Sequence, residues 1–236
     1  MTGGAMTGVM NDFCRGGLRA SGIVVGFLPT AISFGAIAVQ AGVPNGGAIA
    51  MSVWVFAGAS QFAAIEAIRQ NLPWLSIVLT VLIINLRHIP MSIAACRLVY
   101  NRFPRWQRWL LAHGLVDETF ALELSEELRP FPYYLGMHIA CWASWVAGTW
   151  IGCLVGMQIP DRWLQFALPS LFLYLLINAI QALQGRAIWP VLAAGIALTL
   201  ATSRFGSTGV LVAILGVAVL ATVLLEQPDT AGKVKE

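Results

Sequence analysis

Two long stretches of this chain are almost free of charge, and this limits the folds open to it. Only three charged residues lie between positions 20 and 96, and only four lie between positions 131 and 225. Over all 236 residues, 11% are charged and 58% are hydrophobic, whereas a soluble domain carries about 25% charged residues. So much apolar surface would not keep a protein monomeric in water. The sequence therefore predicts an all-α, polytopic helical membrane protein.

Roughly twenty helical residues cross the hydrocarbon core of a bilayer, so spans can be drawn as apolar segments of about that length. The predicted fold is a single transmembrane domain over residues 1–236, with tails at 1–20 and 226–236. The expected location is a bacterial cytoplasmic membrane. The seven apolar segments are 22–40, 47–68, 74–98, 133–158, 163–184, 187–202 and 208–225.

The central region 99–132 differs, because it begins basic and ends acidic around short apolar runs. It fits either an amphipathic helix on the membrane surface or a re-entrant segment. Basic residues both before residue 20 and after residue 96 favour a cytoplasmic side for both regions. Three full spans between them cannot satisfy both preferences. We therefore expect one segment in 20–98 to fail to cross, or the charge rule to be broken once.

Helix breaks are expected where proline or small residues interrupt the apolar segments. Pro29 and Gly35 in the first segment and Pro169 in the fifth are the candidates, together with Ala57 to Ser60 in the second. Phe-Leu-Pro-Thr at 27–30 and Ala-Leu-Pro-Ser at 167–170 resemble each other. This echo raises the hypothesis of an inverted repeat, an arrangement common in transporters.

A stripe of small residues follows one face of the fourth segment at intervals of four. Such a stripe allows another helix to approach closely. That helix could belong to this chain or to a partner, and the sequence leaves both open. The stripe comprises Ala140, Ser144, Gly148, Gly152 and Gly156.

Arg87 and His88 stand in the middle of the apolar run 74–96. An arginine at the centre of a span costs at least ~2.5 kcal/mol, so such residues usually mark a substrate path. The alternative is an arginine that snorkels to the headgroups. Arg87 could bind a carboxylate, and Asp117 could balance either Arg87 or a substrate ammonium group.

Other polar residues in apolar surroundings complete the candidate site. Gly58 and Ser60 flank a predicted helix break, whose free amides could hold a carboxylate. The predicted substrate-binding residues are Gly58, Ser60, Gln61, Asn85, Arg87 and Asp117. The candidates for proton coupling are His88, Asp117 and Glu118, since an imidazole or a paired carboxylate can carry a proton.

The sequence lacks the motifs of the common alternatives. It has no HExxH, GxSxG or Walker sequence, and its four cysteines form no CxxC pair, so neither an enzyme nor an ATP-driven pump is expected. No metal or cofactor is expected. The net charge of +3 fits basic loops beside a membrane better than binding to nucleic acid.

Three sequence blocks resemble the signatures of the AzlC family, also called YgaZ-like. They are Phe-Ala-Gly-Ala-Ser-Gln-Phe at 56–62, Asn-Leu-Arg-His at 85–88 and Val-Asp-Glu-Thr-Phe-Ala-Leu at 116–122, and the resemblance extends over roughly 15–225. It implies the large permease subunit of a branched-chain amino acid exporter. The partner it implies is a small membrane subunit, AzlD or YgaH.

One position departs from the family pattern. Members often carry an acidic residue directly before Phe-Ala-Leu-Pro, and this chain has Gln165 there. If that acid serves proton coupling or ammonium binding, this chain is expected to differ in coupling or in substrate. An amide at this position can still accept a hydrogen bond. The predicted function is proton-coupled export of branched-chain or similar apolar amino acids. The alternative is a channel or membrane scaffold in which Arg87 and Asp117 only clamp helices together.

Overall fold

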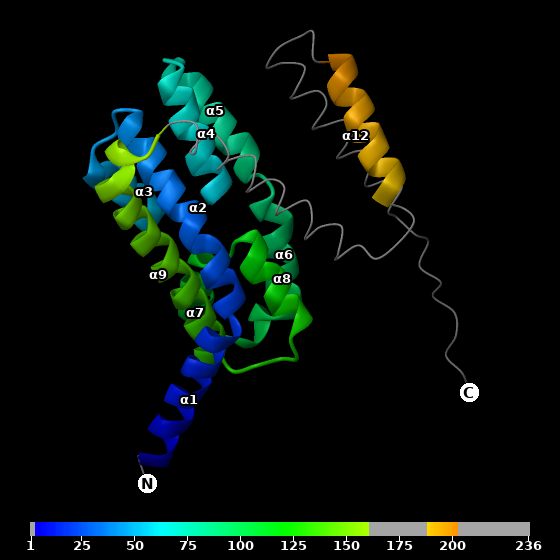
Figure 1. Cartoon of the computed structure of the whole chain (residues 1–236). Helices are drawn as coiled ribbons and strands as arrows, with labels where there is room; N and C mark the ends of the chain where they lie inside the picture. Colours follow the sequence, from blue (N-terminus) through cyan, green and yellow to red (C-terminus); the bar gives the residue numbers. More distant parts are fainter. Residues whose placement is uncertain (1–2, 161–187, 203–236) are drawn as a thin grey trace. The chain divides into compact units, whose positions relative to one another are not determined.

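The computed structural model describes residues 3–160 and 188–202 of the chain (Figure 1). These residues belong to two compact units, Met1–Leu171 and Phe172–Glu236. In the second unit the described part is one apolar helix, α12 (Ile188–Thr202), which overlaps the predicted segment 187–202. The predicted segments 163–184 and 208–225, with Gln165 and Pro169, lie outside the described residues. Within the described ranges all regular structure is helical, so the predicted all-α class is confirmed.

Three segments of the first unit are long and apolar enough to cross a membrane, as predicted. They are α2 (Ser21–Gln40), the pair α5 (Trp74–Asn85) and α6 (His88–Leu98), and α9 (Phe131–Val155) with the short helix η2 (Gly156–Gln158). The middle span is interrupted at Leu86 and Arg87. A helix before the first span, α1 (Gly3–Arg19), continues into α2 through a single turn residue, Ala20.

α1 and α2 run parallel to α9, and glycines set how closely they approach. A Cβ atom on Gly16 would lie 1.9 Å from the carbonyl oxygen of Tyr133, and one on Gly152 would lie 2.0 Å from that of Ile32. Gly148 and Gly156 meet α2 in the same way, at Ala31 and Ala36. Farther toward the start of α9, the hydroxyl of Ser144 donates to the carbonyl of Val24 at 3.0 Å. The small-residue stripe is therefore packing within this chain.

The predicted helix breaks at Pro29 and Gly35 are wrong, because α2 passes both without interruption. Near Pro29 the hydroxyls of Thr30 and Ser33 donate to the carbonyls of Gly26 and Pro29, at 3.2 and 2.9 Å. Such hydroxyls help a membrane helix to tolerate proline. Gly35 instead allows α2 and α9 to approach closely, since a Cβ atom there would lie 2.2 Å from the carbonyl oxygen of Thr149.

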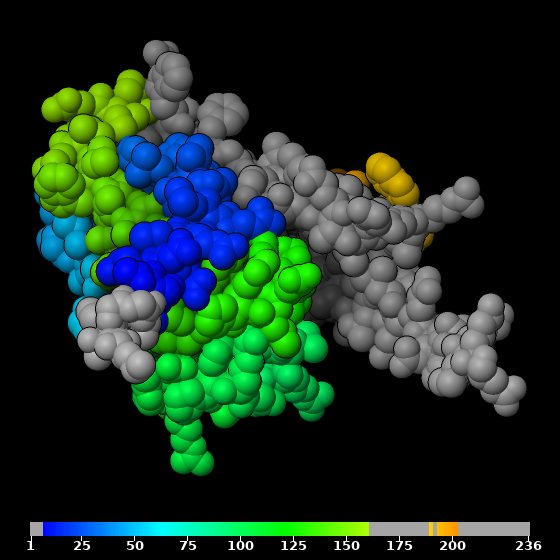
Figure 2. Space-filling view, turned by 90° about the horizontal axis from the view of Figure 1, so that it is seen from below, coloured from blue at the N-terminus to red at the C-terminus, as the bar shows by residue number. Residues whose placement is uncertain are grey.

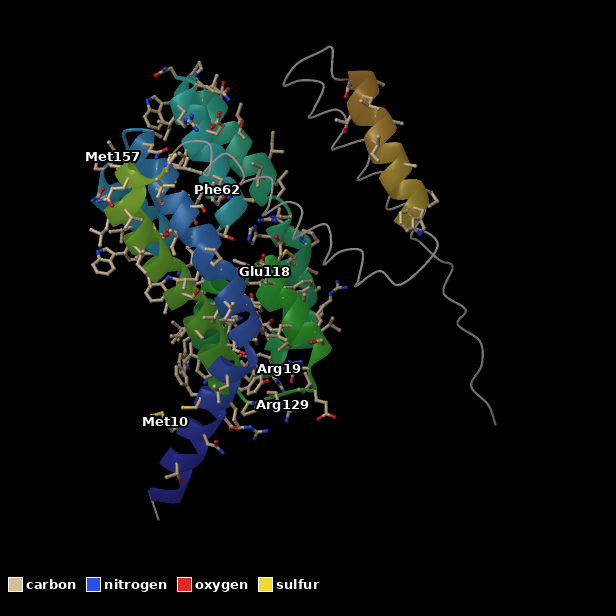
Figure 3. The ribbon with its side chains drawn as sticks, in the orientation of Figure 1. Met10, Arg19, Phe62, Glu118, Arg129 and Met157 are labelled. Carbon is tan, nitrogen blue, oxygen red and sulfur yellow. The ribbon has the colours of Figure 1, made fainter. Side chains whose placement is uncertain are left out.

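Two ends of the first unit can be told apart by their residues. At the basic end, Arg19 donates to Glu126 at 2.5 Å and Arg102 donates to the carbonyl of Arg129. At the other end, the Gln40 end, the Gln40 amide donates to the carbonyls of Gly156 and Ile159 at 2.8 and 2.9 Å. Figure 3 places Arg19 and Arg129 at one end and Met157 at the other. Seen from below, the blue of α1 and α2 borders the green of the region around Glu126 (Figure 2).

The predicted segment 47–68 is not one span but two short helices, α3 (Asn45–Trp54) and α4 (Gly58–Arg69). They turn at Phe56, whose φ of 44° is the left-handed conformation of a tight reversal. Trp142 donates to the carbonyl of Val53 at 3.1 Å, so the turn lies beside the middle of α9. α4 then returns to the Gln40 end, where Arg69 and Gln40 line one shallow pocket. We call this pair the 45–69 hairpin.

The central region forms a second such pair, α7 (Arg105–His113) and α8 (Asp117–Ser125), here named the 105–125 hairpin. Its turn lies against His138 of α9, because a Cβ atom on Gly114 would be 2.5 Å from that side chain. α8 returns to the basic end, where Glu126 meets Arg19. Packing against a spanning helix in this way is the arrangement expected of the re-entrant alternative. The two hairpins thus enter from opposite ends, each following a spanning segment.

This arrangement resolves the conflict over topology, because the 45–69 hairpin does not cross. We expect Asn45→Cys and Gln70→Cys to react with a membrane-impermeant maleimide from the same side of the membrane. Asn101→Cys, at the basic end, should react only from the opposite side. The measurement needs a Cys14→Ser background, since Cys14 is exposed. Labelling of the first two cysteines from opposite sides would show that α3 and α4 cross.

Candidate functional site

The turns of the two hairpins meet near the middle of the spans. The rings of Phe56 and His113, one beside each turn, have centroids 6.4 Å apart. The interruption of the α5–α6 span reaches the same level, since Arg87 forms an ion pair with Asp117, the first residue of α8. A carboxylate at a helix N-terminus is stabilised by the helix dipole. Three breaks in helical structure therefore converge at one depth.

The Arg87–Asp117 pair is half-buried, with side-chain exposures of 32% and 29%. Arg87 thus has a protein partner, as the cost of a lone charge at this depth led us to expect. Only one of its nitrogens, Nη1, donates to Asp117. Arg87 Nε and Asn85 Oδ1 are buried and have no hydrogen-bond partner in the described part of the chain. The break thus leaves one donor and one acceptor unused, two residues apart.

His88 and Glu118 lie near this pair but in different surroundings. The Nδ1 of His88 is 3.1 Å from the carbonyl oxygen of Asn85, so the imidazole occupies the gap between α5 and α6. Glu118, half-buried beside Asp117, lies near Cys141 of α9 and close to the centre of Figure 3. No contact between His88 and Glu118 is present among the described residues.

Gln61 belongs to a separate cluster that ties the 45–69 hairpin to α9. The Nε2 of Gln61 donates to the hydroxyl of Ser52 at 3.2 Å. The hydroxyls of Ser52 and Thr149 are 2.7 Å apart, and the Thr149 hydroxyl also donates to the carbonyl of Trp145 at 2.9 Å. The indole N–H of Trp145 donates to Gln61 Oε1 at 3.1 Å. All four side chains are buried. The hydrogen bonds thus form a closed ring.

Gly58 and Ser60 lie at the start of α4, next to this ring. Gly58 leaves room for Trp145, whose indole would be 2.8 Å from a Cβ atom there. The Ser60 hydroxyl donates to the carbonyl of Ala57 at 2.9 Å. The structure therefore brings Asn85, Arg87 and Asp117 together, and groups Gly58, Ser60 and Gln61 around Trp145. Among the described contacts none joins the two groups directly.

Sequence reasoning did not find the residues that complete these clusters. Ser52, Thr149 and Trp145 were read as parts of apolar segments, and Tyr100, Glu123 and His138 were given no role. A lone carboxylate between Leu122 and Leu124 was the one available signal for Glu123.

Because three buried groups depend on it, we expect Gln61→Leu to destabilise the protein. The change leaves the Trp145 indole N–H, the Ala57 amide and the Ser52 hydroxyl without their bonds to Gln61. Each buried group that loses its partner costs about 1–3 kcal/mol. A lower midpoint of thermal unfolding in detergent would show the loss. Gln70→Leu is the matched control, because Gln70 is exposed and bonds only to Glu66. Equal midpoints for the two variants would contradict the ring.

Comparison with known proteins places this architecture in a family. The sequence profile described as AzlC protein matches residues 22–159, more than half of the chain. The chain belongs to the AzlC family. The matched residues contain both hairpins and all three spans of the first unit. Membership in the AzlC family is consistent with a transport-related role.

Curated relatives agree with this assignment and confirm the predicted membrane location. A membrane protein of Archaeoglobus fulgidus is 34% identical over 209 residues, covering 86% of this chain and 91% of the relative. The inner membrane protein YgaZ of Escherichia coli is 30% identical over 188 residues, covering 74% and 76%. A membrane protein of Helicobacter pylori is 27% identical over 164 residues, covering 66% and 70%. No solved structure matches the chain.

Proposed function

We propose that this AzlC-family protein exports branched-chain or similar apolar amino acids and is driven by the proton gradient. In this proposal it is the large subunit of a two-component transporter. The small subunit is a membrane protein resembling AzlD (YgaH), and this partner is proposed from the family resemblance alone.

The unused donor and acceptor at the break of the α5–α6 span are the observation that carries the proposal. A zwitterionic amino acid needs a donor for its carboxylate and an acceptor for its ammonium group. Arg87 Nε offers the donor, and Asn85 Oδ1 offers the acceptor. Asp117, which already balances Arg87, adds a negative charge beside the ammonium group. Buried polar groups without partners are costly, so a ligand that satisfies both would bind favourably.

Aromatic side chains near the turn of the 45–69 hairpin support an apolar substrate. Phe27 contacts Phe56 and Trp145, with ring centroids 6.2 and 5.5 Å apart, and Phe34 contacts Phe62 at 5.5 Å. All five side chains are buried. An aliphatic side chain gains free energy in such surroundings, whereas a charged one would not. In this proposal Gly58, Ser60 and Gln61 hold the hairpin beside the substrate.

Efflux from proteoliposomes that contain both subunits tests the proposal. Vesicles loaded with labelled leucine, valine or isoleucine should show saturable efflux that an inward proton gradient accelerates. Competitors then test how the substrate is recognised. Unlabelled leucine should compete, while the amine lacking the carboxylate and the acid lacking the ammonium group should compete poorly.

A second candidate function follows from the direct bond between Arg87 and Asp117. A channel or scaffold subunit would need this pair only as a clamp between α6 and α8. Efflux that neither saturates nor responds to the proton gradient would favour a channel. The absence of efflux from complete, folded complexes would favour a scaffold.

A further inference from the structure

A buried carboxylate, imidazole and phenol form a cluster that the proposed substrate site does not use. Glu123 of α8 accepts hydrogen bonds from the hydroxyl of Tyr100, at 2.8 Å to Oε1 and 2.9 Å to Oε2. The Nε2 of His138 on α9 lies 2.5 Å from Glu123 Oε1. Each of the three residues is at most 3% exposed. We call these residues the Glu123 triad.

The 2.5 Å separation places Nε2 of His138 and Oε1 of Glu123 in direct hydrogen-bond contact, so a proton lies between the two atoms. An unpaired ionised carboxylate would be very costly at such a buried position. A polar pair of this kind is a candidate functional site, because it can exist in two protonation states.

A cavity of about 490 Å³ lies next to the triad, near the basic end. Tyr100 belongs to its wall, and Trp109, another wall residue, is 78% exposed, so the cavity reaches the surface. Burial, followed by the neighbouring Glu123 carboxylate, raises the pKa of Tyr100. The phenol therefore stays protonated and acts as a donor. Tyr100 is thus the group between the cavity and Glu123.

Few other titratable groups face the triad. Cys96 of α6 and Tyr134 of α9 lie near Tyr100, and Glu118 of α8 lies one turn and a half before Glu123. Arg105 and Arg108 of α7 line the cavity, and Arg108 donates to the carbonyls of Phe103 and Asn101. His113 of α7 faces Phe56 instead. Neither Arg105 nor Arg108 bonds to Glu123 among the described contacts.

A second proton on the Glu123–His138 pair would change how the 105–125 hairpin packs. The Nδ1 atom of His138 is buried and has no partner in the described part of the chain. A proton taken up by Glu123 turns one of its accepting oxygens into an O–H donor, so Tyr100 or His138 loses its acceptor, and a buried polar group that loses its partner costs about 1–3 kcal/mol. Gly114 leaves His138 its space, since a Cβ atom there would lie 2.5 Å from Nδ1. We expect relief of this cost to shift His138 against the turn of the hairpin, because the two are in close contact at Gly114.

The 105–125 hairpin carries both the triad and the candidate substrate site. Glu123 lies on α8, whose first residue, Asp117, pairs with Arg87. A displacement of the turn beside His138 would therefore also displace Asp117. Proton binding at one end of α8 is in this way coupled to the ion pair at its other end.

We propose that Glu123 and His138 form the proton-binding site of the transport cycle, and that it exchanges protons with the basic-end cavity through Tyr100. In this exchange the Tyr100 hydroxyl passes its proton to Glu123 and takes one from cavity water, or the reverse, so no net charge stays on the phenol. The inference rests on the proposed function and replaces His88 and Glu118 as the groups that carry the proton.

The Glu123→Gln variant separates proton coupling from substrate binding. Glutamine has the shape of glutamate, and its amide oxygen can accept from both Tyr100 and neutral His138, so the variant should fold. In proteoliposomes we expect the stimulation of leucine efflux by a proton gradient to disappear. Exchange of leucine for leucine at equal pH should persist, since Arg87 and Asp117 are unaltered. His138→Gln should behave in the same way.

Three matched variants decide whether this result is specific. Glu127→Gln removes a carboxylate whose side chain is 90% exposed, and should keep the full gradient response. His88→Gln and Glu118→Gln should also keep a response to the gradient. A wild-type response from Glu123→Gln would overturn the proposal. So would a loss confined to His88→Gln or Glu118→Gln.

Infrared difference spectroscopy of the purified complex tests the site without transport. Acidification should produce a carboxylic acid band that is present in wild type and Glu127→Gln and missing in Glu123→Gln. If the wild type moves none of the tested amino acids, the proposed function fails, while this band still supports the proton site. If efflux is normal but the same band remains in Glu123→Gln, the proton site fails and the proposed function stands.

Discussion

Arg87→Ala should abolish amino acid efflux in proteoliposomes that hold both subunits. The change removes the partner of Asp117 and the free Nε donor together, so both the ion pair and the proposed carboxylate contact are lost. Hydrogen bonds to charged groups contribute about 1.5–3 kcal/mol each. One such bond corresponds to a change of roughly 10- to 100-fold in rate.

Arg87→Lys provides the sharper comparison, because it keeps the charge and loses the planar fork. Lysine can still pair with Asp117, but it cannot offer a second, fixed donor at the position of Nε. We therefore expect efflux to fall by most of its value and the complex to remain folded. Arg97→Lys is the control, since Arg97 is exposed and lies on α6, ten residues after Arg87. Near-normal efflux from Arg87→Ala would assign this residue to the snorkelling alternative and remove the basis of the substrate site.

Gly152→Leu should prevent the chain from folding. A Cβ atom on Gly152 would lie 2.0 Å from the carbonyl oxygen of Ile32 and 3.0 Å from the amide nitrogen of Ala36. Both are backbone atoms of a continuous helix and cannot rotate away as a side chain could. Overpacking a tight contact costs about 1–3 kcal/mol even where neighbours can relax, and here the backbones must separate. Gly152→Ala should already lower the thermal midpoint clearly.

If Gly152→Leu folds normally, the small-residue stripe does not depend on packing against α2. Release of the small subunit by Gly152→Leu, with this chain still folded, would place a partner helix on the stripe. Gly26→Ala on α2 is the matched control, because a Cβ atom there meets nothing within 4 Å. Size-exclusion chromatography of the complex distinguishes misfolding, dissociation and no effect.

The sequence predicted those features of the fold that depend on one local property, such as the hydropathy of a segment. The length and hydropathy of an apolar run decide whether it can span, so the segments at 22–40, 74–98 and 133–158 were placed within a few residues. The conflict between basic residues before 20 and after 96 correctly pointed to a segment that does not cross. A charge at membrane depth needs a partner, and Arg87 has Asp117.

Other features depend on contacts between residues far apart in the chain. Pro29 suggested a break that does not occur, whereas the small residues Ala57 to Ser60 correctly indicated the break beside Phe56. Gln61 bonds to other helices because Ser52, Trp145 and Thr149 lie around it. The sequence next to Gln61 does not indicate that these residues are its neighbours in the fold. The same holds for Glu123, whose partners lie 23 residues before it and 15 residues after it.

The hydrogen-bond ring around Gln61 also constrains the order of events during synthesis. Ser52 and Gln61 lie in the 45–69 hairpin, while their partners Thr149 and Trp145 follow 97 and 84 residues later. Until α9 leaves the ribosome, Ser52 and Gln61 can bond only within the hairpin. The bonds that α9 supplies are then missing, and each unsatisfied group inside lipid costs several kcal/mol. Its two helices are also too short to cross alone. We therefore expect the hairpin to enter the bilayer only after α9 has been inserted.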